Sequence, residues 1–176
     1  MNIQTHQTKE GADYYALNPK GNVPALRFPS GVLLNEGSAV LQYLADQNPA
    51  SKLAPANGTI ERYQLQNELN FVATDLHAAG YGPLFAGLEG EVKAKQLAKL
   101  ANRLKYLDEK ILAGGKKNVV GTDLTIVDIY LSVVLSWSGY VGVDLSSYAN
   151  INKFIEGIKA DPKVQAAQAA LAQASK

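Results

Sequence analysis

A proline inside an apolar segment, Pro24, most constrains what the first part of this chain can fold into. Proline cannot donate to a strand ladder, so Pro24 marks the beginning of an edge strand or a special backbone turn. An ordinary tight turn is one interpretation, since only about one X-Pro bond in twenty is cis. A cis Val23–Pro24 bond is the other, and it would turn the backbone of Val23 outward, where a ligand's backbone could add to it as a strand. The run 34–46 that follows contains a predicted helix start, so a candidate peptide-binding edge lies beside the beginning of a helix.

The composition of the chain changes between residues 48 and 58. This segment contains two prolines, three asparagine or glycine residues and few large apolar side chains, which is typical of a linker. The patterns before it are mixed, and those after it are helical throughout. We therefore expect a first domain over residues 1–47, a linker over residues 48–58 and an all-helical domain over residues 59–176.

Short apolar runs predict the elements of the first domain. Residues 1–8 show a weak strand pattern, and residues 12–17 read as one or two helical turns. Residues 23–28 and 32–34 flank a Pro-Ser-Gly turn and predict a hairpin. The helix predicted over residues 36–47 should bury Ala39, Val40, Tyr43 and Leu44.

Beyond the linker, apolar residues recur about every 3.6 positions, the period of a helix. One stripe contains Leu65, Leu69, Val72 and Leu76, and a second contains Leu97, Leu100, Leu104, Leu107 and Ile111. The second stripe is too short for a coiled coil, so we expect a pair of helices in a bundle. Further on, Thr125 and Asp128 have the spacing of a capping box, in which each side chain accepts a hydrogen bond from the backbone N–H of the other.

The composition excludes several kinds of site and partner. The chain has 176 residues, a net charge of +1 and 19% charged residues, which gives no field for nucleic acid or an acidic membrane surface. It has no cysteine, so disulfides, thiolate metal sites and a cysteine nucleophile are excluded. It shows no leader pattern, and no apolar run approaches the roughly 18 residues of a membrane span. We expect a cytoplasmic protein that binds neither nucleic acid nor membranes.

Two segments resemble glutathione transferases, in particular the bacterial beta class. The run 18–46 resembles the second half of the family's glutathione-binding domain, and residues 121–128 resemble the capping-box signature of its helical domain. The segments lie about a hundred residues apart in the family's order. The resemblance implies an α+β/α fold class: a truncated thioredoxin-like N-terminal domain followed by an all-α helical-bundle C-terminal domain.

The resemblance also implies which residues hold glutathione in the first domain. In the family, the residue before a cis-proline binds the cysteinyl backbone, and an acid or amide at the head of the next helix binds the γ-glutamyl end. The matching positions are Val23, Pro24 and Glu36, and the backbone N–H of Gly37 would serve where many relatives carry a hydroxyl. A helix N-terminus suits the γ-glutamyl carboxylate, because it presents unpaired N–H groups and a partial positive charge.

A polar stripe is predicted on the first long helix, residues 59–79, opposite its apolar stripe and clear of its acids. It consists of Tyr63, Asn67, Asn70, Thr74 and His77. The residues alone favour a simple solvated face. The resemblance implies instead that Asn70, Thr74 and His77 contact glutathione. His77 would be the catalytic group, because it alone on this face titrates near neutral pH. Ala78 stands where the family often has a lysine.

The resemblance further implies that the first strand and first helix of the family's N-terminal domain are missing. These elements carry the Tyr, Ser or Cys that contacts the glutathione sulfur, so no residue is assigned that role. A fragment or misplaced start, a degenerate family member, and a chain completed by a partner or by swapping all stay open. An incomplete sheet leaves an edge that pairs readily with another chain, and we expect a homodimer.

Two functions follow from these observations. The first is a glutathione transferase in detoxification, which conjugates the thiolate of its co-substrate glutathione to a small apolar electrophile without a metal. The alternative is a non-catalytic glutathione- or protein-binding module with a transferase-like fold. The missing first strand and Ala78 favour the module, whereas Val23–Pro24, Glu36 and the polar stripe favour the enzyme.

Overall fold

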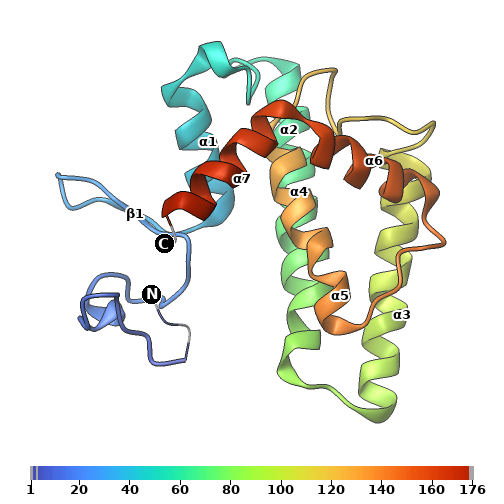
Figure 1. Cartoon of the computed structure of the whole chain (residues 1–176), viewed down its shortest axis with the longest axis horizontal. Coiled ribbons are helices and arrows are strands. Elements are labelled where there is room, and N and C mark those ends of the chain that lie inside the picture. The colour runs from blue at the N-terminus through green and yellow to red at the C-terminus, as the bar shows by residue number, and fades with distance from the viewer. Residues whose placement is uncertain (1, 3, 175–176) are drawn as a thin grey trace. The chain divides into compact units, whose positions relative to one another are not determined.

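The structure, a computed structural model, describes residues 2 and 4–174. The chain forms two compact units, Met1–Ser51 and Lys52–Lys176. The colours of Figure 1 run through the first unit from blue to cyan and through the second from cyan to red. No helix among the described residues is both long and apolar enough to span a membrane.

The first unit contains one small antiparallel sheet and one α-helix. Its elements in chain order are η1 (Tyr14–Ala16), β1 (Leu26–Arg27), β2 (Leu33–Leu34), α1 (Gly37–Gln47) and η2 (Pro49–Ser51). Strands β1 and β2 pair with Leu26 opposite Leu34, so the predicted hairpin is confirmed, although each strand has only two residues. Gly31 closes the turn with a φ of 88°, a conformation that favours glycine.

Two expectations for the first unit are wrong. Of the predicted strand over residues 1–8, positions 1 and 3 lie outside the described residues, and the rest forms only an isolated bridge between Gln7 and Asp13. The Asn2 side chain accepts hydrogen bonds from the N–H groups of Gln4 and Thr5, which makes a turn instead. In α1, Leu44 is 53% exposed, because a sheet of two short strands covers too little of the helix. Val40 is buried as predicted.

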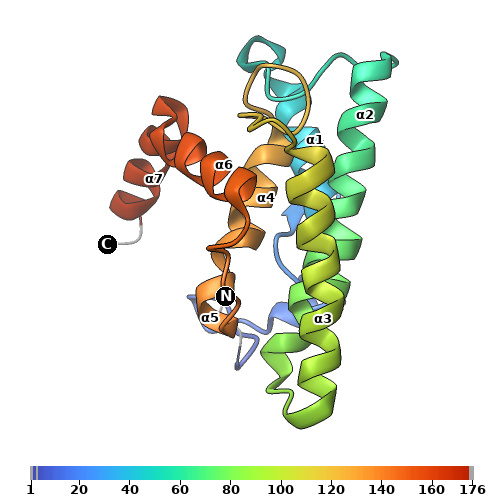
Figure 2. The same ribbon diagram turned by 90° about the vertical axis from the view of Figure 1, so that its right-hand side faces the viewer.

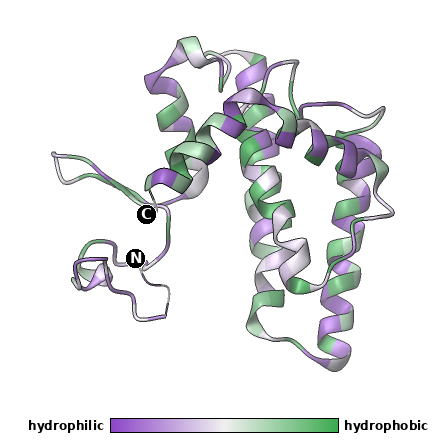
Figure 3. Cartoon of the chain, in the orientation of Figure 1, coloured by the Kyte–Doolittle hydropathy of each residue, from purple (hydrophilic) through white to green (hydrophobic). Residues whose placement is uncertain are grey.

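The second unit is helical, as predicted. Its elements are α2 (Ile60–Asn70), η3 (Phe71–Tyr81), η4 (Gly82–Ala86), α3 (Gly90–Tyr106), η5 (Leu107–Ile111), α4 (Ile126–Ser136), α5 (Ser138–Val141), α6 (Ala149–Ala160) and α7 (Pro162–Ala174). Helix α3 runs alongside the continuous rod of α2 and η3, and α4 packs against the same rod (Figures 1 and 2). Hydrophobic and hydrophilic residues alternate around α3, as expected for a helix with one face on a core (Figure 3).

The core of the second unit contains the two predicted stripes. Leu97 is only half-buried, and the other members are buried together with residues of α4 and α6, namely Leu131, Leu135, Ile151 and Phe154. The predicted capping box is present at the start of α4. The N–H of Thr125 donates to the carboxylate of Asp128 at 2.8 Å, and the N–H of Val119 donates to its other oxygen at 2.7 Å. These bonds fix the connection between α3 and α4.

The rod changes its helical period at residue 71. The segment η3 is a π-helix, in which each N–H bonds to a carbonyl five residues earlier. Gly80 is required in it, because a Cβ there would lie 2.8 Å from the backbone oxygen of Asp75 and 3.1 Å from a methyl group of Leu100. The Gln96 side chain, on α3, donates to the carbonyls of Ala79 and Gly80 at 2.8 and 2.6 Å. It thereby satisfies acceptors near the end of the π-helix.

Candidate functional site

An asparagine network shapes the loop before Pro24. The fully buried Asn18 donates through its amide nitrogen to the carbonyl of Asn22 at 2.8 Å, and Asn35 donates to the Asn18 side-chain oxygen at 2.9 Å. Asn22 in turn donates to the carbonyl of Asn35 at 2.6 Å, and the Tyr14 hydroxyl donates to the carbonyl of Asn22 at 2.8 Å. The network ties the residue before Val23 to the residue before Glu36. It therefore fixes the predicted binding edge relative to the start of α1.

The Val23–Pro24 peptide bond is cis, which confirms that prediction. The Val23 residue is 55% exposed. Its backbone N–H and C=O bond to no residue in the described part of the chain. An exposed backbone with free polar groups is the kind of edge to which an extended peptide can add as a strand.

Glu36 and Gly37 lie at the N-terminus of α1. Glu36 is the N-cap, and its carbonyl accepts the hydrogen bond of Val40 at 3.0 Å. The N–H groups of Gly37, Ser38 and Ala39 bond to no described residue, so the helix presents three donors. Gly37 packs beside the binding edge, because a Cβ at Gly37 would lie 3.7 Å from the Pro24 ring.

The Glu36 carboxylate forms an ion pair at the protein surface. Its Oε1 lies 2.6 Å from Nζ of Lys20, and both side chains are more than half exposed. It caps no N–H group of α1. Exposed pairs of this kind contribute about 0–1 kcal/mol, so the carboxylate can exchange Lys20 for the cation of a ligand at little cost.

The polar stripe of the second unit differs from the prediction. Thr74 donates to the carbonyl of Asn70 at 2.8 Å and also lies 3.0 Å from the carboxylate of Asp75. Asn67 likewise donates to Glu68 at 3.0 Å. The stripe is therefore not kept clear of acids, because neighbouring side chains reach around the helix. The change of period at residue 71 also moves the positions after Asn70 away from the regular α-helical wheel.

His77 lies on η3 in contact with two aromatic residues of the α4 segment. Its Nδ1 is 2.7 Å from the Tyr130 hydroxyl, and the Trp137 ring meets it edge to face with centroids 4.7 Å apart. Burial lowers the pKa of the imidazole, because it disfavours the charged form. At neutral pH His77 is therefore an uncharged group with a fixed ring orientation.

Sequence reasoning missed the residues that hold the candidate groups in place. The three asparagines flank the Val23–Pro24 and Glu36 positions, so their clustering near a candidate edge was a usable signal. The contact between His77 and Tyr130 joins residues 53 positions apart, and no local pattern reveals it. Trp137, the one tryptophan of the sequence, was missed for the same reason.

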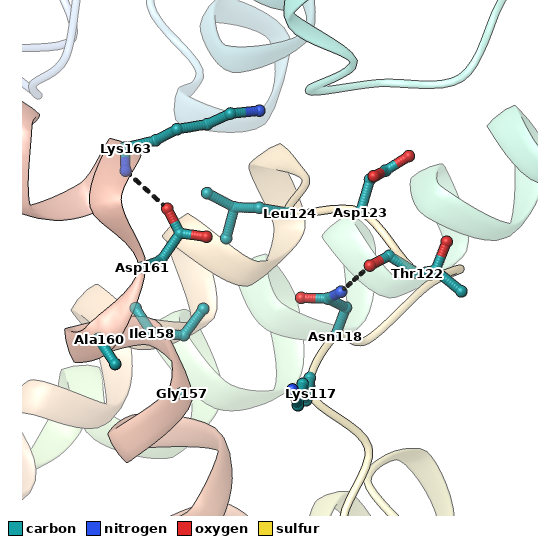
Figure 4. A pocket seen from close by; sticks show the side chains of 10 residues that line it. All are labelled: Lys117, Asn118, Thr122, Asp123, Leu124, Gly157, Ile158, Ala160, Asp161 and Lys163. Atoms are coloured by element: carbon teal, nitrogen blue, oxygen red, sulfur yellow. Dashed lines mark hydrogen bonds between the residues drawn. The ribbon is translucent and has the colours of Figure 1, made fainter.

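A separate pocket of about 430 Å³ in the second unit contains none of the predicted site residues (Figure 4). It lies between the 117–124 loop and the junction of α6 with α7. The Asn118 amide donates to the carbonyl of Thr122 at 2.7 Å, and the Asp161 carboxylate accepts from the N–H of Lys163 at 2.8 Å. Its polar groups thus support the local backbone.

Comparison with known proteins identifies the family. Residues 2–47 match the family described as glutathione S-transferase, N-terminal domain, and residues 72–162 match glutathione S-transferase, C-terminal domain. The glutathione S-transferase GstA of Escherichia coli is 37% identical over 97% of this chain and 84% of its own length. The chain belongs to the glutathione S-transferase family. The predicted fold class is thereby confirmed: a small thioredoxin-like sheet region followed by a helical domain.

Solved structures of two family members resemble this transferase-family chain closely. A sphingomonad glutathione S-transferase complexed with glutathione superposes with a TM-score of 0.87 at 40% identity, covering 97% of this chain and 84% of that one. The bacterial beta class glutathione S-transferase of Sphingomonas chungbukensis gives a TM-score of 0.86 at 37% identity, with the same coverage. The resemblance to bacterial beta-class transferases that the sequence motifs indicated is confirmed.

Proposed function

We propose that this chain binds glutathione at the first unit and transfers its thiolate to small electrophiles. The single observation that carries the proposal is the exposed, unpaired backbone of Val23, held beside the N-terminus of α1 by an asparagine network in which Asn18 is fully buried. It supports the proposal because these are the groups that recognise an extended peptide and a carboxylate. We take glutathione as the ligand because a structure of a related family member contains it.

Each part of glutathione has a proposed partner in the first unit. The backbone of Val23 pairs with the cysteinyl residue, in the manner of an added strand. The free N–H groups of Gly37 and its neighbours receive the γ-glutamyl carboxylate, helped by the partial positive charge of the helix. The Glu36 carboxylate pairs with the ammonium and releases Lys20. The Pro24 ring, which follows Val23 in the chain, lies 3.7 Å from the Cβ position of Gly37.

Asn70, Thr74 and His77, in the second unit, are proposed as further contributors, with His77 as the catalytic group. The thiolate is the nucleophile, so catalysis depends on stabilising it. Its sulfur forms a bond to the electrophilic carbon. In a substitution, the bond between that carbon and the leaving group breaks and its electron pair departs with the leaving group; in an addition, a π bond breaks and its electron pair stays on the acceptor molecule. A hydrogen bond from the His77 imidazole to the sulfur would lower the free energy of the thiolate form.

Further parts of the proposal concern the reaction partners of the protein, its oligomeric state and its location. Glutathione is the co-substrate, the electrophile is small and apolar, and no metal takes part. Among residues 2 and 4–174, no three histidine or acidic side chains gather as metal ligands. We also propose that the protein is a cytoplasmic homodimer, as expected from its family.

A conjugation assay combined with a binding assay tests the proposed function. The chain is incubated with glutathione and a chlorodinitrobenzene, and formation of the thioether is followed by absorbance. The proposal expects saturable turnover above the uncatalysed rate and retention on glutathione-agarose. Retention without turnover would establish the non-catalytic binding module instead. The absence of both retention and turnover would contradict the proposed transferase and a glutathione-binding module alike.

A further inference from the structure

The His77 ring is held from two sides by one helical segment. Tyr130 lies in α4, and Trp137 follows at its C-terminal end seven residues later. Seven residues are about two helical turns, so both side chains lie on the same face of the helix. The Tyr130 hydroxyl meets Nδ1 of His77 at 2.7 Å, and the Trp137 ring packs edge to face against the imidazole. One contact fixes a nitrogen and the other fixes the plane of the ring.

Trp137 is itself immobilised by its neighbours. Its ring also meets the rings of Tyr81 and Phe85 edge to face, with centroids 6.3 and 5.6 Å apart. The fully buried Tyr81 bonds through its hydroxyl to Ser138 at 2.6 Å. The packing that orients His77 thus continues into the buried part of the second unit. These contacts restrict rotation of the Trp137 ring.

The hydrogen bond to Tyr130 also constrains the proton on His77. Burial favours a neutral imidazole, which has one N–H donor and one acceptor nitrogen. A phenol is a stronger acid than a neutral imidazole N–H, so the favoured arrangement has Tyr130 donating to Nδ1. The imidazole proton then resides on Nε2. This nitrogen bonds to no residue in the described part of the chain, so its N–H can serve a ligand.

We propose that Tyr130 is a positioning residue that fixes His77 in the orientation and tautomer in which Nε2–H is available as a hydrogen-bond donor to a thiolate. The proposal rests on the proposed function, since it specifies how His77 acts. It makes His77 a neutral donor to a thiolate. A base that removes the thiol proton would instead need a free lone pair on Nε2, which this tautomer lacks.

Nitrogen NMR of the imidazole tests the tautomer without substrate or turnover. The parent chain, labelled with ¹⁵N at histidine, should show His77 Nδ1 as an acceptor nitrogen and Nε2 as a protonated nitrogen at neutral pH. In Tyr130→Phe the two resonances should move toward each other, as the tautomers interconvert. Tyr140→Phe is the matched control, because Tyr140 is 84% exposed, and its spectrum should equal that of the parent.

Steady-state conjugation supplies the second readout. Tyr130→Phe should lower kcat about three- to tenfold, the rate equivalent of one hydrogen bond, with KM for glutathione within about twofold of the parent. Tyr140→Phe should change neither constant. A proton on Nδ1 in the parent, or an unchanged His77 spectrum in Tyr130→Phe, would overturn the proposal. Absence of turnover in the parent would defeat the proposed function, whereas the NMR result would still decide the role of Tyr130.

Discussion

Asp128 is the residue on which the start of α4 depends. The fully buried carboxylate accepts from the N–H groups of Val119 and Thr125, and the Thr125 hydroxyl lies 2.8 Å from it. Burial raises the pKa of this carboxyl, while the hydrogen bonds from Val119 and Thr125 act in the opposite direction. The group is therefore tolerated in the core only because its donors compensate for the lost water.

Replacing Asp128 should cost stability for the same reason. Asp128→Ala leaves buried donors without an acceptor, and we expect the free energy of unfolding to fall by at least about 2 kcal/mol. Asp123→Ala, five residues earlier on an exposed loop, is the control and should change it by less than about 0.5 kcal/mol. Urea denaturation followed by circular dichroism measures both. Equal stability of the two variants would show that the capping box is dispensable.

His77 allows a second prediction at the scale of one residue. Because burial lowers its pKa, the imidazole should titrate below its usual value of about 6.5. The folded state then binds the proton less readily than the unfolded state. The contribution of His77 to stability should accordingly be complete above that value and decline as the pH falls through it. An NMR titration of the His77 ring measures the midpoint directly, and a midpoint above 6.5 would contradict the burial argument.

At the scale of elements, η3 shows what the sequence could and could not predict. Its apolar residues Val72 and Leu76 continue the stripe of α2, so the 3.6-residue spacing of apolar residues was enough to predict that this segment is helical. The change to a π-helix left no trace in that spacing. It depends on close packing at Gly80 and on the side chain of Gln96, which is 16 residues away. Tertiary contacts of this kind escape local patterns, and they determine the surroundings of His77.

Gly80→Ala tests the close packing of η3. The added methyl group would lie 2.8 Å from a backbone oxygen, and we expect a loss of about 1–3 kcal/mol in the free energy of unfolding. Gly157→Ala in α6 is the matched control, because nothing lies within 4 Å of its Cβ position. That variant should be neutral or stabilised by up to about 1 kcal/mol. Thermal unfolding of the two variants beside the parent decides between these outcomes.

At the scale of the whole molecule, the family motifs and the linker composition were enough to predict the fold class. The hairpin, α1 and the capping box were likewise visible as local signals. Contacts among residues distant in sequence were not, as the network of Asn18, Asn22 and Asn35 shows. Amide side chains form hydrogen bonds with one another only once the chain is folded. A sequence therefore shows that asparagines occur near one another but not which groups they bond to.

The predicted homodimer belongs to this scale. Large apolar side chains are exposed on α2 and α3, among them Ile60, Val92 and Tyr106, which are 66%, 62% and 51% exposed. A second copy that covered such surface would gain free energy from its burial. Light scattering at micromolar concentration should therefore give the mass of two chains. The mass of a single chain under those conditions would contradict the prediction.

Calorimetric titration with glutathione tests whether the start of α1 recognises this ligand. The parent should bind one molecule per chain, and Glu36→Ala should weaken binding by more than about 1 kcal/mol, the range of a charge-assisted hydrogen bond. Lys20→Ala removes the same surface ion pair from its other side but leaves the carboxylate, so its affinity should equal or exceed that of the parent. Unchanged affinity in Glu36→Ala, or equal weakening in both variants, would contradict glutathione recognition at the start of α1.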